Sequence, residues 1–303
     1  MVFWVRKPRR IEFKMNYILN IFVITGIYII LCLSLDLILG YAGLPALGHI
    51  SFAAVGAYTS SLLAFRFGLS PWLGLIVGAM LSLLLGAVIS LSSTRLKGDY
   101  LAITTFGLGL IIYEIANNWV SLTRGPMGLP GIPGFSIFSY QIIHIWQYLV
   151  VVITFVSITY IILSKIVHSP FGKVIQAIRE DETATKSLGK DTDKDKIIVF
   201  MIGAFFAAIA GSLYAHYITF IDPSSFTPME SITVLLMVVF GGMGTLTGSF
   251  VGASTLIIFP EMLRFVGLPD SIAAPIRQMI YGLLLILLML KRPQGIFGKY
   301  HWR

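Results

Sequence analysis

The run Tyr17–Leu35, YILNIFVITGIYIILCLSL, contains no charged residue and decides the class of fold. A helix needs about 20 consecutive apolar residues to cross a bilayer. Basic residues precede this run, as they do in a signal peptide. The run is longer than a cleavable apolar region, however, and no small-residue cleavage site follows it. We therefore expect a retained first membrane span.

Composition extends this interpretation to the whole chain. Of the 303 residues, 12% are charged and 56% are apolar, whereas a soluble domain carries about 25% charged and about 45–50% apolar residues. So little charge cannot cover the surface of a water-soluble body of this size. This argues against a soluble enzyme, a disordered protein and a nucleic-acid binder. The net charge of +8 fits the excess of Lys and Arg on the cytoplasmic side of membrane proteins.

Other apolar stretches also suit membrane helices, because backbone groups in lipid must be hydrogen-bonded within the protein. With the first run, they cover 17–35, 41–65, 70–92, 100–120, 146–164, 197–219, 231–263 and 276–290. The predicted fold is an all-α polytopic membrane protein, a bundle of about 8–10 transmembrane segments. It forms one transmembrane domain over residues 1–303.

Basic residues predict the orientation of this bundle. Segments 1–14, 165–196 and 291–303 are rich in Lys and Arg and are predicted to be cytoplasmic. An odd number of apolar stretches separates the first two, so one stretch should make no net crossing. We assign this role to 41–65, because three glycines and a proline near 40–50 favour a broken or re-entrant helix. On this path 18 of the 22 Lys and Arg lie on one side.

A second interruption is expected near 240–248. The stretch 231–263 must cross an even number of times, and Gly241-Gly242-Met243-Gly244 lies in its middle. Broken helices meeting at these glycines would suit a transport pathway. A glycine-rich turn between two tilted spans is the alternative. The pathway candidates from both interruptions are Gly43, Pro45, Gly48, His49, Gly241, Gly242 and Gly244.

Small residues at every fourth position predict close helix packing. They recur at Gly74, Gly78, Ser82, Gly86 and Ser90, at Gly203, Ala207, Gly211 and Ala215, and at Gly244, Gly248 and Gly252. Such faces indicate a compact bundle and say nothing about what passes through it.

Catalytic and metal-binding patterns are absent from the sequence. There is no Gly-x4-Gly-Lys-Ser/Thr phosphate loop, no His-Glu-x-x-His and no Gly-x-Ser-x-Gly. The single cysteine, Cys32, excludes an intrachain disulfide. Within the spans Glu114, with Asn117 one turn further on, is the intramembrane polar candidate. An interhelical hydrogen bond or snorkelling to the interface would equally account for Glu114.

The segment 165–196 is the most informative polar part of the chain. Ser169-Pro170 predicts a helix start, and Gly189 suits a helix stop. The helix between them has a mixed-charge side and an apolar side, the latter formed by Val174, Ala177, Ile178 and Leu188. An amphipathic helix of this kind suits docking to a soluble partner. A solvated surface helix without a partner is the alternative.

At this loop the sequence resembles the permeases of branched-chain amino acid ABC transporters, of the LivM type. The resemblance begins with Ser169–Lys173, Ala177–Glu182 and Leu188–Gly189. It also includes Gly40–Gly43, Leu47–His49, Gly56–Tyr58, Gly125–Leu129, Gly131–Pro133, Pro223–Phe226, Glu230–Ile232, Gly241–Leu246 and Arg292–Gly295. Several multi-residue matches in the same order make the resemblance specific.

The resemblance implies a permease subunit of an ABC importer in a prokaryotic plasma membrane, with no enzymatic activity of its own. Its partners would be a second homologous permease, two cytoplasmic ABC ATPases and an extracytoplasmic binding protein, within membrane lipid. ATP would bind to the ATPases, so this chain would need no cofactor. The segment that contacts the ATPase would comprise Ala177, Ile178, Arg179, Glu180, Asp181, Glu182 and Gly189.

Two other functions remain as alternatives. The first is an ABC permease for urea or short amides, and the second is a stand-alone secondary transporter. An intramembrane enzyme would need a His, Asp and Glu constellation that the predicted spans lack. Dependence of uptake on an ATPase would separate the ABC permease from the secondary transporter.

Overall fold

The structure is a computed structural model that describes residues 10–94, 96, 98–137, 140–142, 144–264, 279, 282–283, 286 and 295–298. Its helices are α1 (Arg10–Asp36), α2 (Ile50–Phe67), α3 (Pro71–Ser90), α4 (Asp99–Asn118), α5 (Val120–Thr123), α6 (Ile145–His168), α7 (Pro170–Glu180), α8 (Glu182–Ser187), α9 (Thr192–Ile218), α10 (Pro228–Gly241) and α11 (Leu246–Arg264). A π-helical turn (Leu37–Tyr41) extends α1, and 3-10 turns cover Leu91–Thr94, Gly125–Met127 and Pro223–Phe226.

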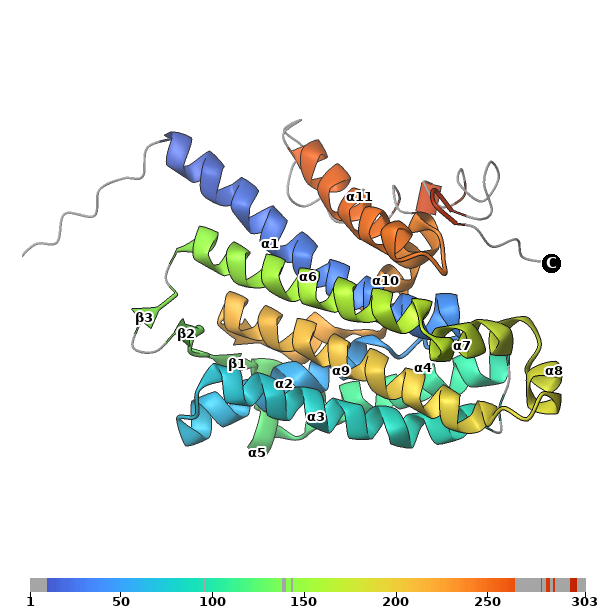
Figure 1. The fold of residues 1–303 in the computed structure, drawn as a ribbon. Helices are drawn as coiled ribbons and strands as arrows, with labels where there is room; N and C mark the ends of the chain where they lie inside the picture. The colour runs from blue at the N-terminus through green and yellow to red at the C-terminus, as the bar shows by residue number, and fades with distance from the viewer. Residues whose placement is uncertain are drawn as a thin grey trace, which may run out of the picture.

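Four two-residue strands form two small antiparallel pairs. β1 (Leu129–Pro130) pairs with β4 (Phe220–Ile221), with Leu129 opposite Ile221. β2 (Ser136–Ile137) pairs with β3 (Tyr140–Gln141). The strands lie at one end of the long helices, and α7 and α8 lie at the other (Figure 1). We call these the strand end and the α7–α8 end.

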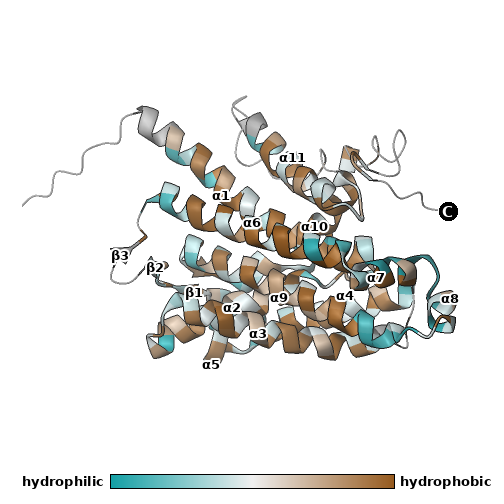
Figure 2. Ribbon diagram, viewed as in Figure 1, coloured by the Kyte–Doolittle hydropathy of each residue, from teal (hydrophilic) through white to brown (hydrophobic). Residues whose placement is uncertain are grey.

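Among the described residues, seven helical segments are long and apolar enough to cross a membrane, and α11 is a shorter apolar helix. Apolar residues dominate the long helices, whereas hydrophilic residues gather around α7, α8 and the start of α9 (Figure 2). The prediction of an all-α polytopic membrane protein is confirmed. The apolar stretch 276–290 lies mostly outside the described residues.

Small residues hold α2, α3 and α9 together. A Cβ added at Gly211 of α9 would lie 1.9 Å from the carbonyl oxygen of Ala53, and one at Gly78 of α3 would lie 2.9 Å from that of Gly56. Ser82 Oγ donates to the Phe52 carbonyl at 3.0 Å. These backbones approach so closely that larger side chains are excluded. The expected packing role of the small-residue faces is therefore confirmed.

The direction of α1 differs from the predicted one. Near its start, Asn20 Oδ1 accepts a hydrogen bond from Tyr217, close to the strand end of α9. Near its end, the Gly40 carbonyl accepts one from Arg179 of α7. Helix α1 therefore runs from the strand end to the α7–α8 end. The prediction that segments 1–14 and 165–196 share one side is therefore wrong for residues 10–14. Residues 1–9 lie outside the described range.

The path of 41–65 is also corrected. Gly43 contacts Arg179 at the α7–α8 end, and Arg66, at the end of α2, donates to the Leu122 carbonyl of α5 at 3.0 Å. The segment therefore makes a full crossing, first as the irregular chain 42–49 and then as α2. The prediction reversed the direction of α1 and omitted the crossing of 41–65, and these two errors cancel. Leu96 and Gly98 therefore still lie beside α7 and Lys196, on the predicted side.

The last elements form an antiparallel pair beside α1. Gly244, between α10 and α11, bonds to Asp36 at the α7–α8 end, and Glu261 of α11 bonds to Tyr17 near the strand end. The stretch 231–263 therefore crosses twice, as expected. The Ile296 N–H donates to the Phe240 carbonyl at 3.1 Å, so residues 295–298 lie at the α7–α8 end. Residues 291–294 and 299–303 are outside the described range.

Candidate functional site

The first helix interruption follows directly from its residues. Gly43 has a φ of +68°, which glycine adopts without strain, and Pro45 removes a backbone donor. The freed groups bond to α4 instead. The Leu47 N–H donates to Thr105 Oγ1 at 3.2 Å, and this hydroxyl donates to the Pro45 carbonyl at 3.2 Å. The predicted break near 40–50 is therefore confirmed, and its irregular backbone is covered by protein.

Gly48 and His49 complete this interruption. A Cβ at Gly48 would lie 2.1 Å from the Thr105 carbonyl oxygen, so α4 contacts the chain directly. His49 is buried, and its Nε2 lies 2.8 Å from Ser34 Oγ of α1. Its ring contacts Phe52 edge to face. His49 thus bonds to a serine hydroxyl rather than to a freed backbone carbonyl, and its role in a pathway stays a prediction.

The second interruption is a turn of four residues between α10 and α11. Gly242 and Gly244 have φ values of +113° and +72°, a region that favours glycine. Thr245 Oγ1 donates to the Gly242 carbonyl at 2.7 Å. Gly241 packs against Gly248 of α11, where an added Cβ would lie 2.0 Å from the Gly248 carbonyl oxygen. The structure thus favours the glycine-rich turn between two spans over helices that meet at mid-membrane.

Arg179 of α7 joins the two interruptions. Its Nη1 donates to the Gly40 carbonyl at 2.6 Å and lies 2.8 Å from the position of a Cβ at Gly244. The Gly244 N–H in turn donates to Asp36 Oδ1 at 2.8 Å. We call Asp36, Gly40, Gly244 and Arg179 the Arg179 cluster.

The Arg179 cluster places an acidic and a basic side chain inside the bundle. The Asp36 side chain is fully buried, and that of Arg179 is 17% exposed. A guanidinium at the carbonyl end of a helix is favourable, because the last carbonyls carry partial negative charge. Asp36 directly follows the apolar run Tyr17–Leu35. Its bond partner Gly244 is 208 residues away, so no local sequence pattern indicates this contact.

The segment 169–190 forms two helices, which corrects the expectation of one. Asp181 breaks the helix with an extended backbone (φ −154°) and caps α8, its Oδ1 accepting from the N–H groups of Thr183 and Ala184. Gly189 follows α8 with a φ of +78°. Helix α7 turns Ile178 and most of Arg179 inward and leaves Ala177 and Glu180 exposed.

An ion network ties α8 to α9. Lys196 is buried, at 1% exposure, and its Nζ lies 2.8 Å from Glu182 Oε1. Lys186 bonds to the same carboxylate and to Asp193, each at 3.2 Å, and these hydrogen bonds raise the pKa of Lys186. Lys196 was not singled out from the sequence. The available signal was its helical spacing with the buried residues Thr192, Val199, Phe200 and Gly203.

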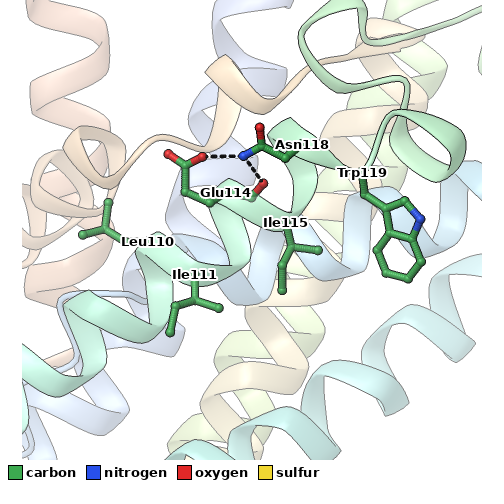
Figure 3. Close-up of a pocket in the computed structure, with 6 residues that line it drawn as sticks. All are labelled: Leu110, Ile111, Glu114, Ile115, Asn118 and Trp119. Carbon is green, nitrogen blue, oxygen red and sulfur yellow. Dashed lines mark hydrogen bonds between the residues drawn. The ribbon is translucent and has the colours of Figure 1, made fainter.

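Glu114 is exposed on the surface of α4 in the part of the chain that the structure describes. Asn118 Nδ2 donates to its Oε2 at 2.7 Å, and the pair is surrounded by the apolar residues Leu110, Ile111, Ile115 and Trp119 (Figure 3). Asn117 is half-buried one turn from Glu114. Within the described residues, the hydrogen-bond partner of the Glu114 side chain is therefore on its own helix.

Together these features define a class of protein. The bundle spans a membrane several times, two of its connections are interrupted at glycines, and an amphipathic loop contacts both interruptions through Arg179. Among the described residues no group of three His, Cys, Asp or Glu could hold a metal ion. These features define a polytopic membrane protein that has a polar loop at one face of its bundle.

Comparison with known proteins identifies the family. The profile of the family described as "Branched-chain amino acid transport system / permease component" matches residues 17–289. The chain is 33% identical over 301 residues to the Escherichia coli K12 high-affinity branched-chain amino acid transport permease LivM, covering 91% of this chain and 69% of that protein. It is 28% identical to a probable LivM permease of Methanocaldococcus jannaschii, covering 89% and 90%.

More distant relatives include the Escherichia coli K12 LivH permease, with 24% identity over 90% of this chain and 91% of that protein. A solved structure, PsaBC from Streptococcus pneumoniae in complex with Fab, matches 92% of both chains with 16% identity and a TM-score of 0.47. The chain belongs to the family of branched-chain amino acid transport permeases, of the LivM type. It is a multi-pass inner-membrane protein and a permease subunit of an ABC importer, from a family of transporters rather than enzymes.

Proposed function

We propose that this chain imports branched-chain or closely related amino acids as one of two homologous permeases, driven by two separate ATPases and supplied by an extracytoplasmic binding protein. ATP binds to the ATPases, because this sequence has no phosphate loop. The names of the LivM and LivH relatives support branched-chain amino acids as the cargo. The same names disfavour urea or short amides.

The α7–α8 end faces the cytoplasm in this proposal. Segment 165–196 carries seven Lys and Arg, and short cytoplasmic loops are rich in these residues. Hydrophilic residues are concentrated at this end (Figure 2). The C-terminal residues 295–298 lie there as well, whereas the start of α1 faces outward.

The observation that carries the mechanism is the two-sided character of α7. Its outer side exposes Ala177 and Glu180, Asp181 follows it, and Leu188 at the end of α8 is 80% exposed. An apolar side chain among charged ones suits a groove on a partner protein. Its inner side holds Arg179 against both helix interruptions. A movement of the ATPases is thereby transmitted to the irregular segment 42–49 and to the glycine turn between α10 and α11.

Uptake of labelled leucine into proteoliposomes tests the proposal. The vesicles contain this chain with its partner permease and ATPases, and the binding protein is added outside. We expect uptake only with ATP inside and the binding protein outside. Uptake by this chain alone, driven by an ion gradient, would identify a secondary transporter instead.

A further inference from the structure

A cavity of about 790 Å³ lies beside α1, α10 and α11, in the half of the bundle nearer the strand end. Its walls are mostly aliphatic and include Ile24, Ile232, Leu236 and Ile257. Two carboxylates, Glu230 and Glu261, also line it. The volume is within the range of about 300–1,000 Å³ that is usual for small-molecule sites.

Glu230 has an unusual position for a helix start. It is the third residue of α10, and its N–H bonds to the hydroxyl of the N-cap residue Thr227 at 3.4 Å. A glutamate at this position commonly returns to the backbone N–H of the N-cap residue. Here its Oε2 instead accepts a hydrogen bond from Tyr28 of α1 at 3.3 Å. The carboxylate is thus held across the cavity. Within the described residues Tyr28 is its donor, and one donor leaves a carboxylate acceptor capacity for a ligand.

We propose that this cavity binds the ammonium group and aliphatic side chain of an amino acid on its way through the permease. Glu230 is the ammonium acceptor, Tyr28 orients its carboxylate, and Ile24, Ile232 and Leu236 contact the side chain. This inference rests on the proposed import function and adds a substrate subsite to it. A carboxylate bonds to an ammonium with charge assistance, an advantage that neutral urea and amides do not receive.

The location agrees with this role. If the α7–α8 end faces the cytoplasm, the cavity is in the outer half of the bundle, where an importer receives its substrate. The opposite end of α10 is the turn whose Gly244 belongs to the Arg179 cluster. The same helix therefore carries the subsite at one end and the link to the loop at the other.

Thiol protection tests the subsite without requiring transport. The natural Cys32 is fully buried, so a cysteine introduced at Thr233, which lines the cavity, is the accessible thiol. In the assembled transporter, Thr233→Cys is labelled with a small methanethiosulfonate in the presence of three probes. These are L-leucine, 3-methylbutylamine, which lacks the carboxylate, and 4-methylpentanoic acid, which lacks the amine. We expect leucine and the amine to slow labelling and the acid to have no effect.

The carboxylate is then tested directly. Combining Thr233→Cys with Glu230→Gln should raise the leucine concentration for half-protection about tenfold or more, the loss expected for a charged hydrogen bond. Glu114→Gln, which alters a carboxylate on α4, is the matched control and should leave protection unchanged. Met229→Cys, 61% exposed at the same cavity, is a second reporter should Thr233→Cys fail to assemble.

The outcomes separate the two proposals. Protection by the acid as strong as by the amine, or protection that survives Glu230→Gln, would overturn the subsite. Leucine uptake by the unmodified transporter is measured in parallel. If that uptake is normal while leucine gives no protection, the subsite is wrong and the import function stands. If no branched-chain amino acid is taken up, the import function itself is wrong.

Discussion

At the scale of single residues, Gly244 combines two demands that no other residue type meets. Its φ of +72° is accessible to glycine without strain. The place of its missing Cβ is taken by Arg179 Nη1 at 2.8 Å and by the Gly40 carbonyl oxygen at 3.1 Å. The arginine tip is flexible and could move away, but it would then lose its bond to Gly40. Gly244 therefore leaves the space that the Arg179 guanidinium needs in order to bond to the Gly40 carbonyl.

Gly244→Ala is expected to reduce leucine uptake sharply while the transporter still assembles. The positive φ contributes a strain of about 1–2 kcal/mol, and the methyl group displaces the guanidinium. Gly68→Ala is the matched control, because Gly68 has a φ of +63° with nothing within 4 Å of the added Cβ. Comparable losses of uptake in both variants would show that backbone strain alone is responsible.

Arg179→Lys tests the link from the other side. A lysine keeps the charge but cannot present two nitrogens in a fixed plane, so the bond to Gly40 or the one to Glu180 is lost. We expect uptake to fall about tenfold or more, as for the loss of a charged hydrogen bond, while the ATPases still co-purify. Arg66→Lys makes the same replacement at the strand end, where Arg66 donates to the Leu122 carbonyl at 3.0 Å, and should change uptake little. Normal uptake by Arg179→Lys would exclude Arg179 as the transmitting residue.

At the scale of elements, the sequence predicted most helices but could not predict how the loop divides. The Ser169 cap and the Gly189 stop are local signals, and both lie at the ends of the loop helices. The break at Asp181 depends on its carboxylate capping α8 instead of continuing α7, and on Glu182 reaching Lys196 of α9. This second contact joins residues 14 apart, so no local pattern indicates it.

The contact between Glu182 and Lys196 is expected to hold α8 against α9. Glu182→Gln removes the carboxylate that lies 2.8 Å from the buried Lys196 ammonium and leaves the more distant Asp193 at 3.7 Å. Breaking one side of a buried pair is worth about 3–5 kcal/mol, so the melting temperature of the detergent-solubilised transporter should fall by several degrees. The double variant Glu182→Gln/Lys196→Met should recover most of this loss. A double variant as unstable as Glu182→Gln would contradict the pairing.

At the scale of the whole molecule, the helical and membrane-spanning nature of the long segments followed from composition, but their direction did not. The basic cluster around Arg10 and Lys14 favoured a cytoplasmic start, and the glycines near 40–50 allowed a stretch without a crossing. Each inference was locally reasonable. The structure places the start of α1 beside the end of α9 and takes 42–67 fully across. Charge bias is a statistical preference, whereas these tertiary contacts decide the path.

Thiol accessibility in sealed vesicles checks this path. Met127→Cys at the strand end and Leu188→Cys at the α7–α8 end replace side chains that are 82% and 80% exposed, and the natural Cys32 is buried. A membrane-impermeant maleimide should label Met127→Cys in right-side-out vesicles and Leu188→Cys in inside-out vesicles. Asn16→Cys, exposed near the start of α1, should follow Met127→Cys because α1 begins at the strand end. Labelling of Asn16→Cys in the same vesicles as Leu188→Cys would instead place the start of α1 in the cytoplasm. One apolar stretch before α7 would then make no net crossing of the membrane.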